Sequence, residues 1–212
     1  MADNEHSLAT YVSDMLSLER HVSEPFDSQL RSDAFTKNSD GLEIVTRLST
    51  LSRAHIDSLQ TCLDGLGGHA ATPMKEAVAG AAGFVASTID KMRKTELSKA
   101  LRDDYTALAL CCAGYTMLQT TALAMRDSSV AALAQGHLKD YAQAVMDIGE
   151  ALPMFVVGEL SDLGVDVDRT AIEPSKRAAS QAWRSAGSSH AAETGSVLTG
   201  SSTTAASGGS RN

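Results

Sequence analysis

Two side chains suited to metal chemistry stand on neighbouring predicted helices. Glu19 lies between the apolar Met15 and Val22, on the stripe that the 3.6-residue period predicts to face the core. His55 lies on the apolar stripe of the next helix, and counting back from the turn near Asn38 places it within one turn of Glu19. Carboxylate and imidazole groups are ligands that iron and manganese accept. The sequence therefore predicts that Glu19 and His55 meet in the core.

The second half of the chain offers fewer ligands. A di-iron helical bundle takes a Glu from each of two helices and a Glu-x-x-His pair from each of the other two. Tyr105–Met125 holds no charged residue, so it supplies no carboxylate. Further along, His137 and Tyr141 lie on a predicted inward face beside Asp140, and Tyr115 lies at the same depth. Two irons would need more anions than this. The candidate metal ligands are Glu19, His55, Asp140 and His137, with iron or manganese as the ion.

Each candidate ligand also has a structural interpretation. Glu19 can face solvent or pair with Arg47 or Arg53, His55 can be a core histidine with satisfied hydrogen bonds, and His137 can be half-exposed. The inward tyrosines can be packing residues. Other chemistries find less support, because the sequence has no strand followed by a glycine-rich phosphate loop and no Gly-x-Ser-x-Gly elbow. We therefore predict no catalytic residues.

The elements that must position these side chains are helices. Strand signals are scarce, and helical periodicity recurs along the chain. The four long helices are expected at about 7–35, 38–65, 98–126 and 130–160. Asp40 and Glu43 have the spacing of a capping box at the start of the second helix. A shorter helix, Met74–Lys94, connects the second long helix to the third. This pattern predicts an all-α four-helix bundle with a short crossover helix between helices two and three.

Composition and charge exclude several classes of function. The 212 residues carry a net charge of −8, which argues against nucleic acid and anionic membranes as partners. Tyr105–Met125 is long enough to span a bilayer, but its Thr, Ala and Gln content favours a buried helix, so we expect no integral span. The N-terminus has no basic and apolar signal segment, and three cysteines do not make a disulfide framework. Both features predict a cytoplasmic protein.

The composition changes after the predicted bundle. We expect the bundle to cover residues 1–163, followed by an irregular flank with a short basic helix at 164–186. From residue 187 to 212, Ser, Thr, Gly and Ala dominate, which predicts a disordered tail. Trp183 either packs on the bundle or anchors a protein partner, and the tail is a second candidate contact.

Several segments resemble the bacterial stress-associated ferritin-like proteins. His55–Gln60, running on to Leu63, Leu66 and two glycines, is similar to the second helix of that family. Glu19 falls where the family has its first-helix Glu. The crossover that begins Pro73–Glu76 and the tyrosine within Gly114–Leu118 also look similar. The resemblance extends over residues 8–160.

The resemblance implies a ferritin-like four-helix bundle, often dimeric, associated with stress and holding a di-metal centre in intact members. This chain departs from the family at the ligands. Leu108 and Cys111 stand at the expected Glu positions of the third helix, and Tyr141 stands at the second Glu of the fourth. Only Glu19, His55 and Asp140 match.

Three functional hypotheses follow. The first is a non-catalytic ferritin-like bundle that acts through binding or assembly, as a homodimer and in a stress-related role. The second is a metal-binding protein or oxidase with a reduced site. The third is a cargo protein docked to a protein shell by its C-terminal tail. Peripheral membrane association through Ala77–Ala86 is a further alternative.

Overall fold

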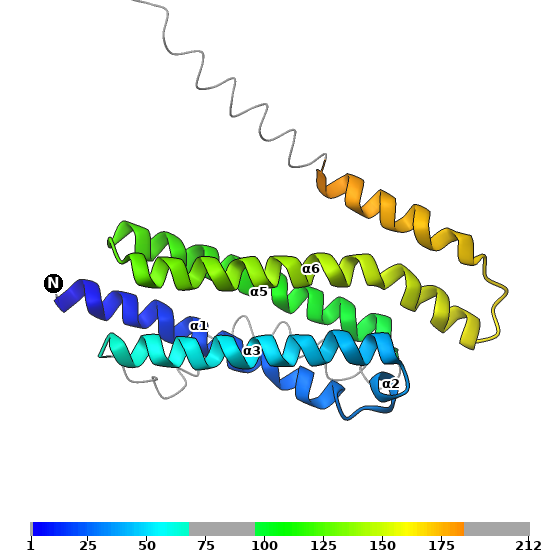
Figure 1. Cartoon of the computed structure of the whole chain (residues 1–212), viewed down its shortest axis with the longest axis horizontal. Coiled ribbons are helices and arrows are strands. Elements are labelled where there is room, and N and C mark those ends of the chain that lie inside the picture. Colours follow the sequence, from blue (N-terminus) through cyan, green and yellow to red (C-terminus); the bar gives the residue numbers. More distant parts are fainter. Residues whose placement is uncertain (1, 68–95, 185–212) are drawn as a thin grey trace, which may run out of the picture. The chain divides into compact units, whose positions relative to one another are not determined.

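The chain is all-helical over the residues whose placement is known. The structure, a computed structural model, describes residues 2–67 and 96–184, with side chains from residue 7, and no strand occurs in these ranges. Figure 1 shows the four long helices side by side. The elements are α1 (Ala2–Gln29), α2 (Asp33–Thr36), α3 (Ser39–Gly65), α5 (Leu97–Ala124), α6 (Ser128–Asp162) and the 3-10 turn η1 (Arg169–Ala171). The predicted all-α class is confirmed.

Polar side chains define where two of the helices begin. The Asn38 side chain accepts a hydrogen bond from the Gly41 amide at 2.9 Å, so Asn38 caps α3 and the predicted capping box at Asp40 is wrong. Asn38 is the residue in extended conformation, whereas Asp40 already lies inside the first turn. Asp127 caps α6, accepting from the amides of Ser129 and Val130, both at 3.0 Å.

The first predicted helix is divided in two. α1 ends at Gln29, and after a turn the short α2 places Phe35 in the core. Pro25 lies inside α1 without ending it. Between α5 and α6, Arg126 adopts a positive φ of 63°, which lets the chain reverse direction over a very short connection.

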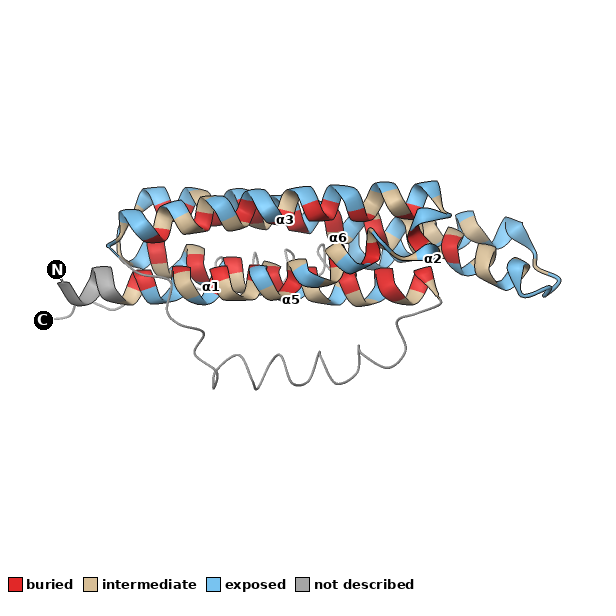
Figure 2. Cartoon of the chain, turned by 90° about the horizontal axis from the view of Figure 1, so that it is seen from below, coloured by how far each residue is buried: buried red, intermediate tan, exposed pale blue. Residues whose placement is uncertain are grey.

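The long helices pack around one hydrophobic core. α1 packs on α3 and α5 packs on α6, and the two pairs meet through α1 with α5 and α3 with α6. Figure 2 shows buried positions recurring along each helix, as an amphipathic period requires. The larger fully buried apolar side chains are Leu16, Phe26, Phe35, Leu48, Leu59, Leu63, Leu101, Leu108, Leu118 and Ile148.

A glycine allows α1 and α5 to approach closely. A Cβ at Gly114 would lie 2.8 Å from the Met15 sulfur, closer than atoms pack without a shift. Tyr115 follows Gly114 directly, and Glu19 lies one helical turn after Met15. The close approach at Gly114 therefore brings Glu19 and Tyr115 to the same level of the core.

The inward face of α5 differs slightly from the sequence prediction. The 3.6-residue period of this segment predicts that Leu108, Cys112 and Tyr115 face the core; Leu108 and Tyr115 are fully buried, but Cys111 is buried in place of Cys112, which is half-buried. Asp104 is also buried and accepts a hydrogen bond from Gln29 at 2.9 Å. The charge-free run thus begins one residue after a buried carboxylate.

The outward face of α5 exposes the large apolar side chains Leu110, Met117 and Leu123. α5 is the one described helix whose length and hydropathy would allow it to cross a membrane. Leu108, Tyr115 and Leu118 on its other face pack in the core.

The chain divides into two compact units, Met1–Val167 and Asp168–Asn212. Of the second unit, residues 168–184 are described: they contain η1 and a helix over 172–184, with the Trp183 side chain 60% exposed. The expected crossover helix at Met74–Lys94, the membrane alternative at Ala77–Ala86 and the tail at 187–212 lie outside the described residues.

Candidate functional site

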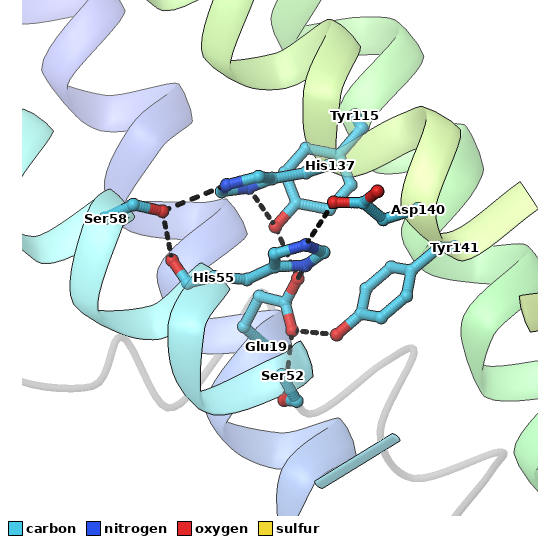
Figure 3. A network of polar contacts seen from close by, with 8 residues as sticks. All are labelled: Glu19, Ser52, His55, Ser58, Tyr115, His137, Asp140 and Tyr141. Carbon is cyan, nitrogen blue, oxygen red and sulfur yellow. Dashed lines mark hydrogen bonds and ion pairs between the residues drawn. The ribbon is translucent and has the colours of Figure 1, made fainter. Parts of the chain in front are cut away.

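A buried carboxylate lies at the centre of a network of polar side chains from α1, α3, α5 and α6 (Figure 3). Glu19 is fully buried. Its Oε1 accepts from the Tyr115 hydroxyl and lies 3.1 Å from His55 Nδ1. Its Oε2 accepts from the Tyr141 hydroxyl at 2.5 Å and from the Ser52 hydroxyl at 3.3 Å. Four donors therefore compensate the cost of burying one negative charge.

His55 connects this carboxylate to a second one nearer the solvent. Its Nδ1 faces Glu19, and its Nε2 lies 3.4 Å from Oδ2 of Asp140, whose side chain is 48% exposed. Both ring nitrogens thus face carboxylate oxygens.

A second histidine completes the network on the other side of Tyr115. His137 Nδ1 lies 3.0 Å from the Tyr115 oxygen, and its Nε2 lies 2.9 Å from the Ser58 hydroxyl. Because the Tyr115 hydroxyl donates to Glu19, it accepts from His137, which puts the proton of neutral His137 on Nδ1. The His137 ring stacks on His55, with ring centroids 3.8 Å apart and planes 13° from parallel.

Burial and neighbouring charges set the protonation of these groups. Burial raises the pKa of both Tyr115 and Tyr141 far above the usual range, and the adjacent Glu19 charge and hydrogen bond raise it further. Burial, reinforced by Glu19 and Cys112, likewise raises the pKa of the Cys111 thiol. Burial and the neighbouring His55 lower the pKa of His137 to about 3, although Asp140 acts in the opposite direction. At neutral pH the phenols, the thiol and His137 are therefore uncharged.

The structure brings all four predicted ligands into this one network. Glu19 and His55 meet in the core as predicted, and Asp140 and His137 both contact the same group of side chains. The alternative of an exposed, arginine-paired Glu19 is wrong, because Arg47 pairs with Asp147 and Arg53 with Asp27, both at 2.6 Å.

Sequence reasoning missed the two serines of the network. Ser52 and Ser58 are on α3. Ser52 donates to Glu19, and the Ser58 hydroxyl lies 2.9 Å from both the His55 carbonyl oxygen and His137 Nε2, so its one proton serves these two acceptors. The signal was present for Ser52, because it occupies a position on the apolar stripe of that helix. A serine at such a position has to find a buried acceptor.

The arrangement fits hydrogen bonding better than metal ligation. In the described parts of the chain, no group of three or more His, Cys, Asp or Glu side chains is placed to hold a metal ion. A ligating imidazole holds its ion close to the ring plane, but the planes of His55 and His137 are stacked nearly parallel. One ion therefore cannot bind both rings unless a ring turns. It would also have to displace hydroxyl donors from Glu19.

Comparisons with known proteins show a shared fold and no family. No protein-family model matches the sequence, and no curated protein matches it. The crystal structure of protein XCC3681 from Xanthomonas campestris pv. campestris matches with a TM-score of 0.61 and 16% sequence identity, over 77% of this chain and 99% of that one. At this level of identity the likeness shows the helical fold alone.

We predict that Glu19→Gln destabilises the protein strongly. The Gln amide replaces one carboxylate oxygen by an NH2 group, so two N–H donors face two groups that now donate to Glu19, which should cost about 3 kcal/mol of unfolding free energy. Urea denaturation measures this. Glu24→Gln, an exposed position on the same helix, is the control and should stay within about 0.5 kcal/mol of the wild type. Equal effects of the two substitutions would contradict a central role for Glu19.

We also predict that His137 makes the protein sensitive to acid. His137 stays neutral in the folded state down to a pKa of about 3, but it is protonated in the unfolded chain below its ordinary value of 6.5. The unfolded state therefore binds more protons in this window, and the free energy of unfolding falls as the pH drops from 6.5 toward 3.

His137→Phe keeps an aromatic ring at the stacking position and cannot titrate, so its stability should fall less between pH 7 and pH 4.5. His21→Phe, a half-buried position outside the network, is the control and should retain the wild-type pH dependence. Urea denaturation at a series of pH values measures both. A wild-type pH dependence in His137→Phe would refute the role of His137.

Proposed function

We propose that the protein is a ferritin-like four-helix bundle that acts through binding and assembly rather than catalysis, with a second copy of the chain as its partner. The observation that carries this proposal is the hydrogen bonding of Glu19. A carboxylate that held a metal ion would offer its oxygens to the ion. Both oxygens of Glu19 instead face hydrogen-bond donors from the chain itself.

The chemistry of the replaced ligands supports this reading. Tyr141 stands where the resembling family has a Glu, and its hydroxyl donates to Glu19 at 2.5 Å. Two carboxylates at those positions would repel each other unless a cation lay between them, whereas a phenol and a carboxylate attract each other. The site is therefore stable as a purely organic hydrogen-bonded layer that fixes the register of the four helices.

The outward face of α5 supports assembly. It exposes Leu110, Met117 and Leu123, with exposures of 39, 59 and 60%, and carries no charge over about 30 Å of helix. The hydroxyls of Thr116 and Thr120 on this face donate to carbonyls one turn earlier, at 2.9 and 2.8 Å, so each is already bonded within the helix.

Charge favours this face for contact between two copies. The chain carries a net charge of −8, so two copies repel each other over most of their surfaces. The charge-free face of α5 is where two copies can meet without bringing like charges together, and its apolar side chains gain from burial.

We predict that the full-length protein sediments as a dimer and that Met117→Lys shifts it to the monomer. The lysine places a positive charge at the middle of the α5 face, which must be desolvated on contact. Sedimentation equilibrium measures the dissociation constant, and Met146→Lys on α6, 40% exposed, is the matched control. A monomeric wild type, or the same loss in both variants, would overturn the proposed partner.

Metal binding is the second candidate function. The observation that favours it is the meeting of Glu19, His55, Asp140 and His137 in one network, where the sequence predicted iron or manganese ligands. Binding would require that the hydroxyl donors leave Glu19 and that one imidazole ring turns.

Anaerobic loading with Fe(II) or Mn(II) tests the two candidates against each other. We predict less than stoichiometric metal after desalting, and no change in metal content in a Glu19→Ala/His55→Ala variant. Elemental analysis by mass spectrometry measures the metal. Stoichiometric metal in the wild type that is lost in the double variant would establish metal binding and contradict the proposed role without a metal.

A further inference from the structure

The phenol of Tyr115 lies between Glu19, which can accept its proton, and His137, which can donate a hydrogen bond to its oxygen. It is fully buried, its hydroxyl donates to Glu19, and its oxygen lies 3.0 Å from His137 Nδ1. Neither the binding role nor the metal alternative uses this arrangement. The arrangement matters when the Tyr115 phenol loses an electron.

Loss of an electron makes a phenol a strong acid, because the positive charge left on the ring is relieved when the hydroxyl proton departs. In an apolar core this proton usually has no acceptor, and the buried radical cation is costly. At Tyr115 the acceptor is already in hydrogen-bond contact. The proton needs to move only along the bond that joins the phenol to Glu19 Oε1.

We propose that Tyr115 is a one-electron redox site. A one-electron oxidant removes an electron from the Tyr115 ring while the phenol O–H bond breaks and an O–H bond forms on Glu19. The products are a neutral Tyr115 phenoxyl radical, a neutral Glu19 carboxylic acid and the oxidant reduced by one electron. Return of one electron from a reductant moves the proton back.

The electrostatics of the core favour this exchange. Before oxidation the site holds the Glu19 carboxylate, a negative charge without any exposure to water. Removing an electron and shifting the proton neutralises that charge, so neither Tyr115 nor Glu19 is left charged in the core.

His137 distinguishes Tyr115 from Tyr141. Both phenols donate to Glu19, with ring centroids 6.1 Å apart. Only the Tyr115 oxygen also lies against an imidazole N–H, which can continue to donate to the radical oxygen after the proton has moved. Burial also keeps solvent and other radicals away, so the Tyr115 radical should persist.

The distance to the surface allows electrons to reach the site without a bound cofactor. A helix with its side chains is about 10 Å across, so the centre of the four packed helices lies roughly one helix diameter from water. The oxidant therefore acts from outside by electron tunnelling and needs no pocket beside Tyr115.

The test is photo-oxidation of the full-length protein by a ruthenium(III) polypyridyl complex, followed by electron paramagnetic resonance. We expect a long-lived phenoxyl signal in the wild type and its loss in Tyr115→Phe. Tyr141→Phe and Tyr105→Phe, the latter on the same helix, should keep it. An unchanged signal in Tyr115→Phe, or equal loss in Tyr115→Phe and Tyr141→Phe, overturns the assignment.

A second measurement on the unsubstituted protein does not depend on how a variant folds. Because the proton stays on Glu19, the rate of formation of the long-lived radical should not change with the concentration of buffer base. Oxidation of an exposed tyrosine such as Tyr11 passes its proton to water or buffer and should accelerate as buffer base increases. A long-lived signal whose formation follows buffer base overturns proton transfer to Glu19.

Discussion

The burial of one carboxylate constrains the packing of the whole helical unit. An unpaired Glu in a hydrophobic core would cost several kcal/mol, so Glu19 is tolerated only where its donors converge on it. Those donors come from three other helices: Ser52 and His55 from α3, Tyr115 from α5 and Tyr141 from α6. Sliding any helix by one residue moves a donor by about 1.5 Å and breaks its hydrogen bond. Apolar packing alone would tolerate several registers, whereas this network selects one.

The two stacked histidines of the network have different hydrogen-bond partners. His55 faces a carboxylate at each ring nitrogen, while His137 faces a phenol oxygen and a serine hydroxyl. Two stacked imidazolium rings would repel each other at a centroid distance of 3.8 Å. Burial, together with the neighbouring His55, lowers the pKa of His137 to about 3, so His137 stays neutral in the stack.

The sequence predicted the fold class and the residues of the site better than their exact orientations. Apolar periodicity placed Glu19 and His55 on inward stripes, and helix lengths placed Tyr115 beside Asp140 and Tyr141, because a rigid rise per residue converts sequence distance into depth. Orientation about the helix axis was less certain. The period favoured Cys112 over Cys111 as the core residue, and because both side chains are small and apolar, composition gave no signal to correct it. Hydrogen-bond roles could not be predicted at all, since they depend on distances of a few tenths of an ångström.

The threonines on the outer face of α5 show that polarity depends on conformation. Thr106, Thr116 and Thr120 all return their hydroxyl protons to the carbonyl four residues earlier, and each then shows its methyl group to the surroundings. Hydropathy scales count these residues as polar, yet on the folded helix they resemble valine. The same segment in an unfolded chain would present free hydroxyls to water. The apolar character of this face is thus partly acquired on folding, so a newly made chain can remain well solvated until α5 has formed.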